Sequence, residues 1–159
     1  MLKPQPMPET RPIQNRKARF EYELQDTMEA GISLLGWEVK AIRAGRAQLV
    51  GGYVVVRNSE AWLLGLILSP LPQAQRWAAD ADRTRKLLLS KSQILRIANH
   101  CRNPGRSCIP TRIYMKGRYI KAEIALAVGR KTHDKRQHIK DREWERRKAR
   151  MKRGEHSGY

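Results

Sequence analysis

Basic side chains gather in four short clusters along the chain. Their ammonium and guanidinium groups suit phosphate oxygens, and such contacts fix the register of a bound nucleic acid while reading little of its base sequence. One such cluster is common on a protein surface, but four on one small domain favour a polyanionic partner. The clusters are 15–19 (Arg16, Lys17 and Arg19), Arg43 with Arg46, 83–86 (Arg83, Arg85 and Lys86), and Lys116 with Arg118 and Lys121.

A longer basic block covers residues 130–153. It contains twelve Lys and Arg against four Asp and Glu, a net charge of +8, which makes it a ready binder of phosphate groups. Its few apolar residues do not recur at the helical spacing of three and four, so the block has no apolar face with which to fold on its own. These residues are Ile139, Trp144, Ala149 and Met151.

The same block is rich in helix-forming residues and has neither Pro nor Gly before Gly154. Glu143 precedes Arg147 by four positions, which is a supportive pair on a helix. A helix of this length is marginal in water without a packed face, so we predict a segment that is mostly disordered when free and helical when bound. A solvated surface helix or a simple solubility tail is the alternative interpretation.

Candidates for catalytic or metal chemistry are few. Glu21 and Glu23 could form a carboxylate pair, but the solvent face of an edge strand explains them better, since no partner acid or desolvating pocket is indicated. His100, Cys101 and Cys108 do not have the spacing of a structural zinc site and lack a fourth ligand, and Cys101 fits better as a core residue. Without a nucleophile elbow, Walker loop or dinucleotide fingerprint, we predict a non-enzyme with no metal and no cofactor.

Aromatic side chains could add base stacking to phosphate binding. We expect Tyr22, Tyr53 and Tyr114 to point into the core, because aromatic residues usually fill small barrels. Trp77, which lies in a predicted loop at 70–84, is the better candidate for stacking on an unpaired base.

The whole chain has a strongly positive balance: 33 Lys and Arg stand against 15 Asp and Glu, giving a net charge of +18. Its 159 residues, 40% of them apolar, suffice for one domain with a core. The longest apolar run, Ala61–Leu68, has eight residues, well short of the roughly 20 that a membrane-spanning helix needs. Because residues 1–10 lack the apolar region of a secretory signal, we expect a cytoplasmic protein with reduced cysteines.

The elements that must position these side chains are mainly short strands. Two hairpins are predicted, with turns at Asn58–Ser59 and at Lys116–Gly117. About six strands at close intervals favour a mainly β fold, a small barrel or sandwich, with the OB-type barrel among the options. Alternating or β-branched runs predict strands at 20–24, 32–35, 53–56, 61–68, 108–115 and 119–128, with 87–89 as a further short strand or lead-in.

Two short helices complete the predicted elements. Residues 37–44 precede Gly45, which is a typical helix stop. Ser90 and Gln93 have the spacing of a capping box at the start of a second helix. The apolar residues of this helix fall on one face at helical spacing: Ile94, Ile97, Ala98 and Cys101.

Five motifs stand in order along the chain between Asn15 and about Arg150. They are Asn15-Arg16-Lys17-Ala18-Arg19; Glu29-Ala30-Gly31-Ile32; Gly36-Trp37-Glu38-Val39-Lys40 with Arg43-Ala44-Gly45; Arg83-Thr84-Arg85-Lys86-Leu87-Leu88-Leu89; and Gly129-Arg130-Lys131 with Asp134-Lys135-Arg136. In type and spacing they resemble the SsrA-binding protein (SmpB) family. The resemblance covers almost the whole chain.

The resemblance implies a cytoplasmic, non-catalytic RNA-binding adaptor with an OB-fold barrel. Such a protein binds the tRNA-like domain of transfer-messenger RNA (tmRNA, or SsrA RNA) and works in trans-translation, the rescue and peptide tagging on ribosomes stalled without a stop codon. The barrel would stand in for the missing anticodon half of a tRNA, while the tail probes the empty mRNA channel as a helix. The implied partners are tmRNA, the ribosome at its mRNA channel, decoding region and rRNA, and elongation factor Tu through charged tmRNA.

The resemblance also implies site residues. By motif, the tmRNA-contacting set is Asn15, Glu29, Leu88 and Lys121. Basic neighbours complete the predicted tmRNA site: Arg16, Lys17, Arg19, Arg83, Arg85 and Lys86. The ribosome-engaging set is Gly129, Arg130, Lys131, Asp134, Lys135, Arg136, Ile139 and Trp144.

These expectations divide the chain into three parts. Residues 1–14, with four prolines, are predicted to be a disordered arm, 15–129 an OB-fold RNA-binding body, and 130–159 a basic tail. Two other functions stay open: a ribosomal or rRNA-binding OB protein, and an RNA-acting enzyme such as a nuclease. The lack of acid and metal clusters in the sequence speaks against the enzyme.

Overall fold

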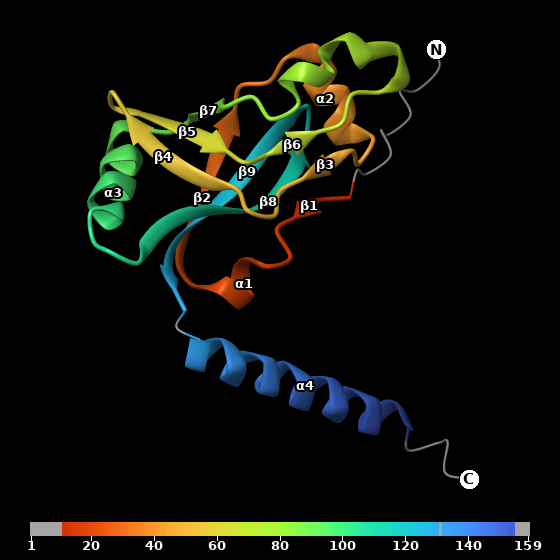
Figure 1. The fold of residues 1–159 in the computed structure, drawn as a ribbon, viewed down its shortest axis with the longest axis vertical. Helices are drawn as coiled ribbons and strands as arrows, with labels where there is room; N and C mark the ends of the chain where they lie inside the picture. The colour runs from red at the N-terminus through yellow and green to blue at the C-terminus, as the bar shows by residue number, and fades with distance from the viewer. Residues whose placement is uncertain (1–10, 131, 155–159) are drawn as a thin grey trace.

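A computed structural model describes residues 11–130 and 132–154 of the chain (Figure 1). The strands in this range are β1 (Ile13–Gln14), β2 (Tyr22–Ile32), β3 (Ala47–Gln48), β4 (Tyr53–Arg57), β5 (Glu60–Leu64), β6 (Ile67–Leu68), β7 (Arg85–Leu88), β8 (Arg106–Lys116) and β9 (Tyr119–Gly129). The helical segments are α1 (Ala18–Glu21), α2 (Gly36–Arg43), the 3-10 helix η1 (Pro72–Asp80), α3 (Lys91–Cys101) and α4 (Thr132–Gly154).

Six of the strands close into a barrel. In ring order they are β8, β4, β5, β7, β2 and β9, and the pairing of β9 with β8 completes the circle. All neighbours in the ring are antiparallel, and closure leaves no free edge within it. Outside the ring, β1 pairs with β8, and β3 pairs with β6 in a small separate sheet. This arrangement confirms the predicted mainly β, OB-type closed barrel of about six strands with short helices.

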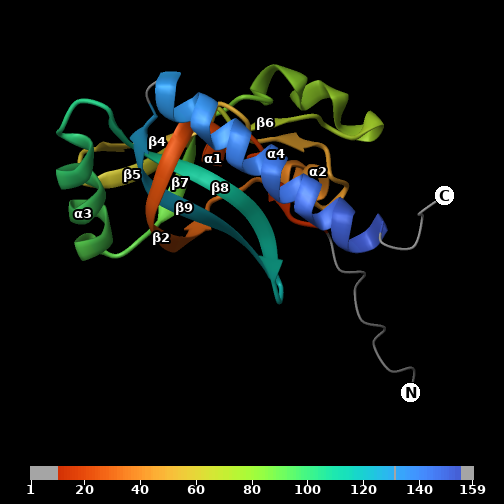
Figure 2. The ribbon, with the colours of Figure 1, turned by 90° about the horizontal axis from the view of Figure 1, so that it is seen from below.

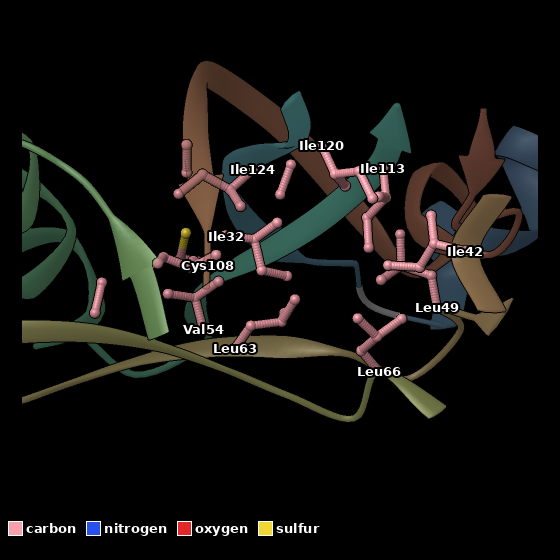
Figure 3. Packing of buried hydrophobic residues seen from close by; sticks show 14 of the residues in the cluster. Ile32, Ile42, Leu49, Val54, Leu63, Leu66, Cys108, Ile113, Ile120 and Ile124 are labelled. Atoms are coloured by element: carbon pink, nitrogen blue, oxygen red, sulfur yellow. The ribbon is translucent and has the colours of Figure 1, made fainter. Parts of the chain in front are cut away.

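Aliphatic side chains from facing strands fill the interior of the barrel (Figure 3). Leu63 of β5 and Ile124 of β9 are fully buried, and full burial of such a side chain contributes about 1.5–3 kcal/mol. Alternate residues of a strand point to opposite faces. On β2, Met28 and Ala30 are therefore buried while Glu29 between them is exposed, and this alternation sets the outer face that carries the candidate site.

Both predicted hairpins are confirmed. Asn58 and Ser59 adopt φ values of 51° and 61°, the left-handed pair that a two-residue hairpin turn needs, and they join β4 to β5. Gly117 has a φ of 60° in the turn that joins β8 to β9, where Lys116 pairs with Tyr119. The long β8–β9 hairpin supplies two neighbouring walls of the barrel.

Both predicted helices of the body are also confirmed. At the start of α3, the Gln93 N–H donates to Ser90 Oγ (3.3 Å) and the Ser90 N–H donates to Gln93 Oε1 (3.0 Å), which is the expected capping box. Ile97 is fully buried under this helix. Cys101, however, is exposed in the last turn, so its predicted place in the core is wrong; the contact of this turn with β9 is made by His100, whose Nε2 lies 2.9 Å from Ala127 O.

Two predicted strand boundaries near the N-terminus are wrong. The Glu21 N–H donates to Lys17 O (3.0 Å), so Phe20 and Glu21 complete the short helix α1 and the strand starts at Tyr22. One helical turn is too short to leave a periodic signal of its own. The predicted strand at 32–35 does not form either, because Ile32 is the last residue of β2 and the next three residues lead into α2.

Two further predictions failed in the middle of the chain. The apolar run 61–68 is two strands, not one, because Gly65 between β5 and β6 has a φ of 81°. A Cβ at Gly65 would lie 2.9 Å from Gly52 Cα, so the two backbones can pass each other only with glycine there. The predicted loop at 70–84 contains the 3-10 helix η1, which begins at Pro72.

The ends of the described chain behave differently. Residues 1–10 of the predicted arm lie outside the described residues, whereas Ile13–Gln14 within it form β1 against β8. At the other end, α4 leaves the barrel beside α1 and extends away from it (Figures 1 and 2). Within residues 11–130 and 132–154, no helix combines the length and the apolar character needed to cross a membrane.

Candidate nucleic-acid interface

One outer face of the barrel brings together three of the four residues in the tmRNA-contacting set. Leu88 of β7 pairs with Gly31 of β2, and Gly31 pairs with Lys121 of β9. Lys121 pairs in turn with Tyr114 of β8, so one row crosses four strands. Glu29 lies two residues before Gly31 and therefore points to the same side. We call these five residues the outer sheet face.

Leu88 is an apolar side chain on this face that is 57% exposed. It lies across the backbone of Gly31, where an added Cβ would sit 3.1 Å from Leu88 Cβ, so glycine makes room for it. Such an exposed aliphatic surface beside charged groups suits the face of a base or a ribose. The sequence showed Gly31 and Leu88 in separate motifs but not their contact.

Glu29 is held by two donors from β8. The Tyr114 hydroxyl donates to Glu29 Oε2, and Lys116 Nζ lies 3.1 Å from Oε1 and 3.3 Å from Oε2. The hydrogen bond from Tyr114, followed by that from Lys116, lowers the pKa of Glu29 below its ordinary value. Desolvation and the neighbouring carboxylate raise the pKa of Tyr114 to about 12. Glu29 is thus ionised and Tyr114 is a neutral donor at physiological pH.

Asn15 sits next to this face through the β1 side of the barrel. Its backbone N–H donates to Thr111 O (2.8 Å) and its Nδ2 donates to Pro110 O (2.9 Å). Thr111 Oγ1 donates to Glu123 Oε2 (2.6 Å), and Glu123 is the cross-strand partner of Glu29. A pocket of about 410 Å³ opens here, and the basic side chains beside Asn15 stand at its rim. The exposed residues of the 15–19 cluster are Arg16, Lys17 and Arg19.

In the 83–86 cluster, Arg83 and Arg85 form ion pairs that stabilise the fold. The prediction that Arg85 contacts RNA is therefore wrong. Arg85 is fully buried. Its Nε lies 2.6 Å from Glu38 Oε2, and its Nη1 donates to Leu66 O (2.7 Å). Arg83 Nη2 lies 2.5 Å from Glu38 Oε1. Because the guanidinium of Arg85 is buried and makes four hydrogen bonds inside the protein, a phosphate at the surface does not reach it.

Glu38 is the buried carboxylate that pairs with Arg83 and Arg85 of this cluster. Burial alone would raise the pKa of Glu38, but the hydrogen bonds from Arg83, from the Leu35 N–H and from Arg85 outweigh it and lower the pKa. Glu38 also caps α2 by accepting from the Leu35 N–H at 2.8 Å. A carboxylate at the third position of a predicted helix is the signal that could have found this role, and it ties α2 to β7.

Lys86, the last residue of that cluster, is half-exposed. Its Nζ lies 3.1 Å from Glu60 Oε1, and both side chains remain about two-fifths exposed, at 41% and 42%. Such an exposed pair exchanges partners easily in water. Lys86 therefore stays available to an anion.

The tail begins where β9 ends, against α1. The Arg130 N–H donates to Glu21 O (2.9 Å) and Arg130 Nε donates to Arg19 O (3.1 Å). Lys135 Nζ then lies 5.9 Å from the centre of the Phe20 ring. The start of the tail thus contacts α1, which overlaps the 15–19 cluster, so the two regions predicted to bind RNA meet at this joint.

Beyond this joint the ribosome-engaging set lies on an open helix. Ile139 is 42% and Trp144 50% exposed, and Arg136 is exposed. Lys131 and the side chain of Asp134 lie outside the described residues. The structure gives the tail the helical conformation expected of its bound state, and its predicted disorder in the free protein stays a prediction.

The aromatic residues considered for base stacking are all at least partly exposed. Trp77 is 38% exposed in η1, with the Arg76 guanidinium 5.2 Å from its ring centre. Tyr53 is 46% exposed, so its predicted place in the core is wrong, and Tyr22 and Tyr114 are only half-buried. The barrel interior is filled mainly by aliphatic residues, and Tyr22 packs instead against the small separate cluster of Ala18, Ile109 and Ala127.

Comparison with known proteins adds a family to this geometry. The family model described as SmpB protein matches residues 12–154. The SsrA-binding protein of Chromohalobacter salexigens is 49% identical over 141 residues, 88% of this chain and 90% of that protein. That of Psychrobacter cryohalolentis is 44% identical over 151 residues, 94% of this chain and 96% of that protein.

A solved structure agrees with these relatives. A chain described under "tmRNA-SmpB: a journey to the center of the bacterial ribosome" is 36% identical to this one, with a TM-score of 0.65. The match covers 76% of this chain and 85% of that chain. The similarity therefore extends through most of both chains in sequence and in fold.

Proposed function

The chain belongs to the SmpB protein family, and from this premise we propose that it is the RNA-binding adaptor of trans-translation. It binds the tRNA-like domain of tmRNA and delivers it to stalled ribosomes for rescue and peptide tagging. The observation that carries the proposal is the outer sheet face, where Glu29, Leu88 and Lys121 from three different strands stand in one strip.

The barrel makes the tmRNA contact in this proposal. The aliphatic surface of Leu88 receives an unpaired base or ribose, Lys121 neutralises a phosphate, and Glu29 accepts from a base amino group or a 2′-hydroxyl. The exposed basic residues of the 15–19 cluster hold the RNA backbone and fix its register. Asn15 anchors that cluster to β8 through the two hydrogen bonds described above.

The tail engages the ribosome in this proposal. A segment of +8 with no apolar face gains little from packing on a protein, but an RNA-lined channel neutralises its charge and releases counterions. The empty mRNA channel of a stalled ribosome offers such a surface, and the helix α4 is the form that the tail takes there. The contacting residues run from Gly129 to Trp144, as the sequence analysis gave them.

The protein acts without catalysis and in the cytoplasm, where its partners are. In this proposal the adaptor itself makes and breaks no bond, because the ribosome carries out peptide transfer. Elongation factor Tu joins the complex through the charged tmRNA. The support for a non-catalytic role is positional: the acidic side chains near the site, Glu29 and Glu123, are each already paired with basic or hydroxyl donors.

The experiment that tests this function is competition between tmRNA and tRNA over a series of salt concentrations. Phosphate contacts weaken steeply with salt, whereas contacts that depend on the shape of the RNA weaken less. We expect tmRNA to win increasingly as salt rises, measured by fluorescence anisotropy with labelled RNA. Equal affinities for tmRNA and tRNA at high salt would contradict a specific tmRNA site. The result would then favour the alternative function of a ribosomal or rRNA-binding OB protein.

A further inference from the structure

The hydroxyl of Tyr114 donates a hydrogen bond to one carboxylate oxygen of Glu29 on the outer sheet face. We propose that Tyr114 is a positioning residue: its hydroxyl, together with Lys116, holds the Glu29 carboxylate in one orientation so that its free lone pairs meet a hydrogen-bond donor of the RNA. This inference rests on the proposed function. It adds a residue that none of the five sequence motifs contains.

The first support is the geometry of the carboxylate. An ionised carboxylate has about four acceptor sites. Tyr114 occupies one on Oε2, and Lys116 approaches both oxygens from one side at 3.1 Å and 3.3 Å. The Glu29 side chain remains 38% exposed, so acceptor sites are left open toward solvent on the same outer face as Leu88 and Lys121.

The second support is the way the Tyr114 ring is fixed independently of Glu29. The Arg112 guanidinium lies over the ring at 4.5 Å from its centre, a favourable cation–π distance. Arg112 is itself held by Glu123, whose Oε2 lies 3.2 Å from Arg112 Nε. Thr111 donates to the same oxygen of Glu123 at 2.6 Å. A ring clamped in this way aims its hydroxyl at a constant position.

The third support is electrostatic. A carboxylate on an RNA-binding surface is repelled by phosphates unless a positive charge lies close by. Lys116 supplies that charge by direct contact, and Lys121 adds to it across the neighbouring strand. Tyr114 stabilises the ionised carboxylate without adding a charge of its own. Glu29 can therefore accept a hydrogen bond from RNA while the surface stays positive overall.

Fixing the carboxylate also lowers the entropy lost on binding. A free glutamate side chain loses rotamer entropy when it is immobilised, about 0.5–1.5 kcal/mol for a rotamer-rich side chain at an interface. The two donors hold Glu29 before the RNA arrives. Removing the Tyr114 hydroxyl should therefore weaken tmRNA binding by about three- to tenfold, since 1.4 kcal/mol corresponds to a factor of ten.

The test compares Tyr114→Phe, Glu29→Gln and the double variant in anisotropy titrations with tmRNA. Tyr114→Phe keeps the ring under Arg112 and removes only the hydroxyl. We expect it to bind about three- to tenfold more weakly, Glu29→Gln to bind more weakly still, and the double variant to equal Glu29→Gln alone. Full additivity in the double-variant cycle, or unchanged binding by Tyr114→Phe, would overturn the proposal.

The matched control is Tyr119→Phe on the same β8–β9 hairpin. Tyr119 is 69% exposed, and within the described residues no hydrogen bond of its hydroxyl is recorded. We expect binding by this variant to equal that of the wild type. A loss as large as that of Tyr114→Phe would show that any tyrosine hydroxyl of the hairpin matters, which would also overturn a specific role for Tyr114.

A pH profile separates positioning from simple structural support. Tyr114 and Lys116 lower the pKa of Glu29, so removing the hydroxyl raises it toward the ordinary value. The other charged groups around Glu29 are Arg112 on β8 with Lys121 and Glu123 on β9, and the variant leaves all of them in place. Binding that needs ionised Glu29 fails as pH falls through that pKa, so the failure should begin at higher pH in Tyr114→Phe.

An NMR titration of the Glu29 carboxyl group in the RNA-free protein measures its pKa in the wild type and in Tyr114→Phe. An unchanged Glu29 pKa would contradict the contact on which the inference depends. Failure of the proposed function is distinguishable, because the wild type itself would then show no preference for tmRNA over tRNA. Interference mapping of tmRNA identifies the donor that Glu29 contacts, because 2′-deoxy substitution removes a 2′-hydroxyl and inosine removes the amino group of guanine. The substitution that weakens binding to the wild type should have no further effect on binding to Glu29→Gln.

Discussion

The barrel and the tail both bind polyanions in this proposal, but their basic side chains differ in how they are held in place. In the barrel, basic groups are fixed by acidic partners on neighbouring strands, as Arg112 is by Glu123 and Lys116 by Glu29. In the tail beyond Arg130, the described polar contacts between side chains join residues three or four apart on the same helix, such as Lys148 with Glu145 at 3.8 Å. The barrel therefore presents a rigid surface and the tail an adaptable one.

This difference teaches what each region can recognise. A preorganised surface loses little entropy on binding and can reject an RNA of the wrong shape. A chain of high charge without a packed face binds wherever a matching anionic surface surrounds it. We therefore propose that selection of tmRNA belongs to the barrel and recognition of an empty RNA-lined channel to the tail. Among the described residues, the two meet where Arg130, just before α4, and Lys135, in its first turn, contact α1.

Removal of the tail is the strongest way to break this comparison. We expect deletion of residues 130–159 to leave tmRNA affinity within about threefold of the full chain, because the fixed contacts of the barrel remain. Peptide tagging on stalled ribosomes should be abolished. A reconstituted translation reaction on an mRNA without a stop codon measures tagging, and anisotropy measures affinity. If the truncated chain lost tmRNA binding, the division between the two regions would be wrong.

The rigidity of the barrel can be tested at its buried ion pair. Replacing Glu38 by Ala leaves Arg85 buried without its partner, and breaking such a pair typically costs about 3–5 kcal/mol. Urea unfolding near neutral pH measures the loss in free energy of unfolding. The matched control is Glu60→Gln, which breaks the exposed pair with Lys86 on a neighbouring strand and should change stability by less than about 1 kcal/mol.

The same pair predicts a pH dependence with a definite sign. The folded protein lowers the pKa of Glu38 below its ordinary value of 4.5. Its stabilising contribution is therefore fully present above that ordinary value and is lost as pH falls through the folded-state pKa. The wild type should lose stability in acid more steeply than Glu38→Gln. Parallel acid curves for the two proteins would contradict an ionised Glu38 in the core.

The buried pair also marks the limit of what the sequence could predict. The mainly β character, both hairpins and the capped helix α3 follow from alternation, turn residues and caps, which are local signals; those signals left barrel and sandwich open, and the family resemblance implied the OB barrel. The pairing of Arg85 with Glu38 joins residues far apart in sequence, and a cluster of basic residues looks the same whether one of them is buried or not. The charge pattern alone therefore assigned Arg85 to the surface.

The candidate site was predictable in its residues but not in its construction. Motifs pointed to Glu29, Leu88 and Lys121, yet only strand register places them in one strip. Tyr114 was predicted to point into the core because an aromatic residue at an alternating position usually fills a small barrel. Its outward direction depends on the bulge between Pro110 and Arg112 in β8, and a bulge shifts the inside–outside alternation of every residue beyond it.

The smallest expected effect concerns the adaptability of the tail. The contact of Lys148 with Glu145 spans three positions on α4, and such pairs contribute about 0.2–0.5 kcal/mol each to a helix. We expect a peptide of residues 130–159 to be mostly non-helical by circular dichroism, to gain helix on adding RNA, and to change little in either state with Glu145→Gln. Because no packed face unites these weak pairs, losing one should not collapse the rest. A full helix in the peptide without RNA would make the tail a preformed rod, and its difference from the barrel would then be one of surface chemistry alone.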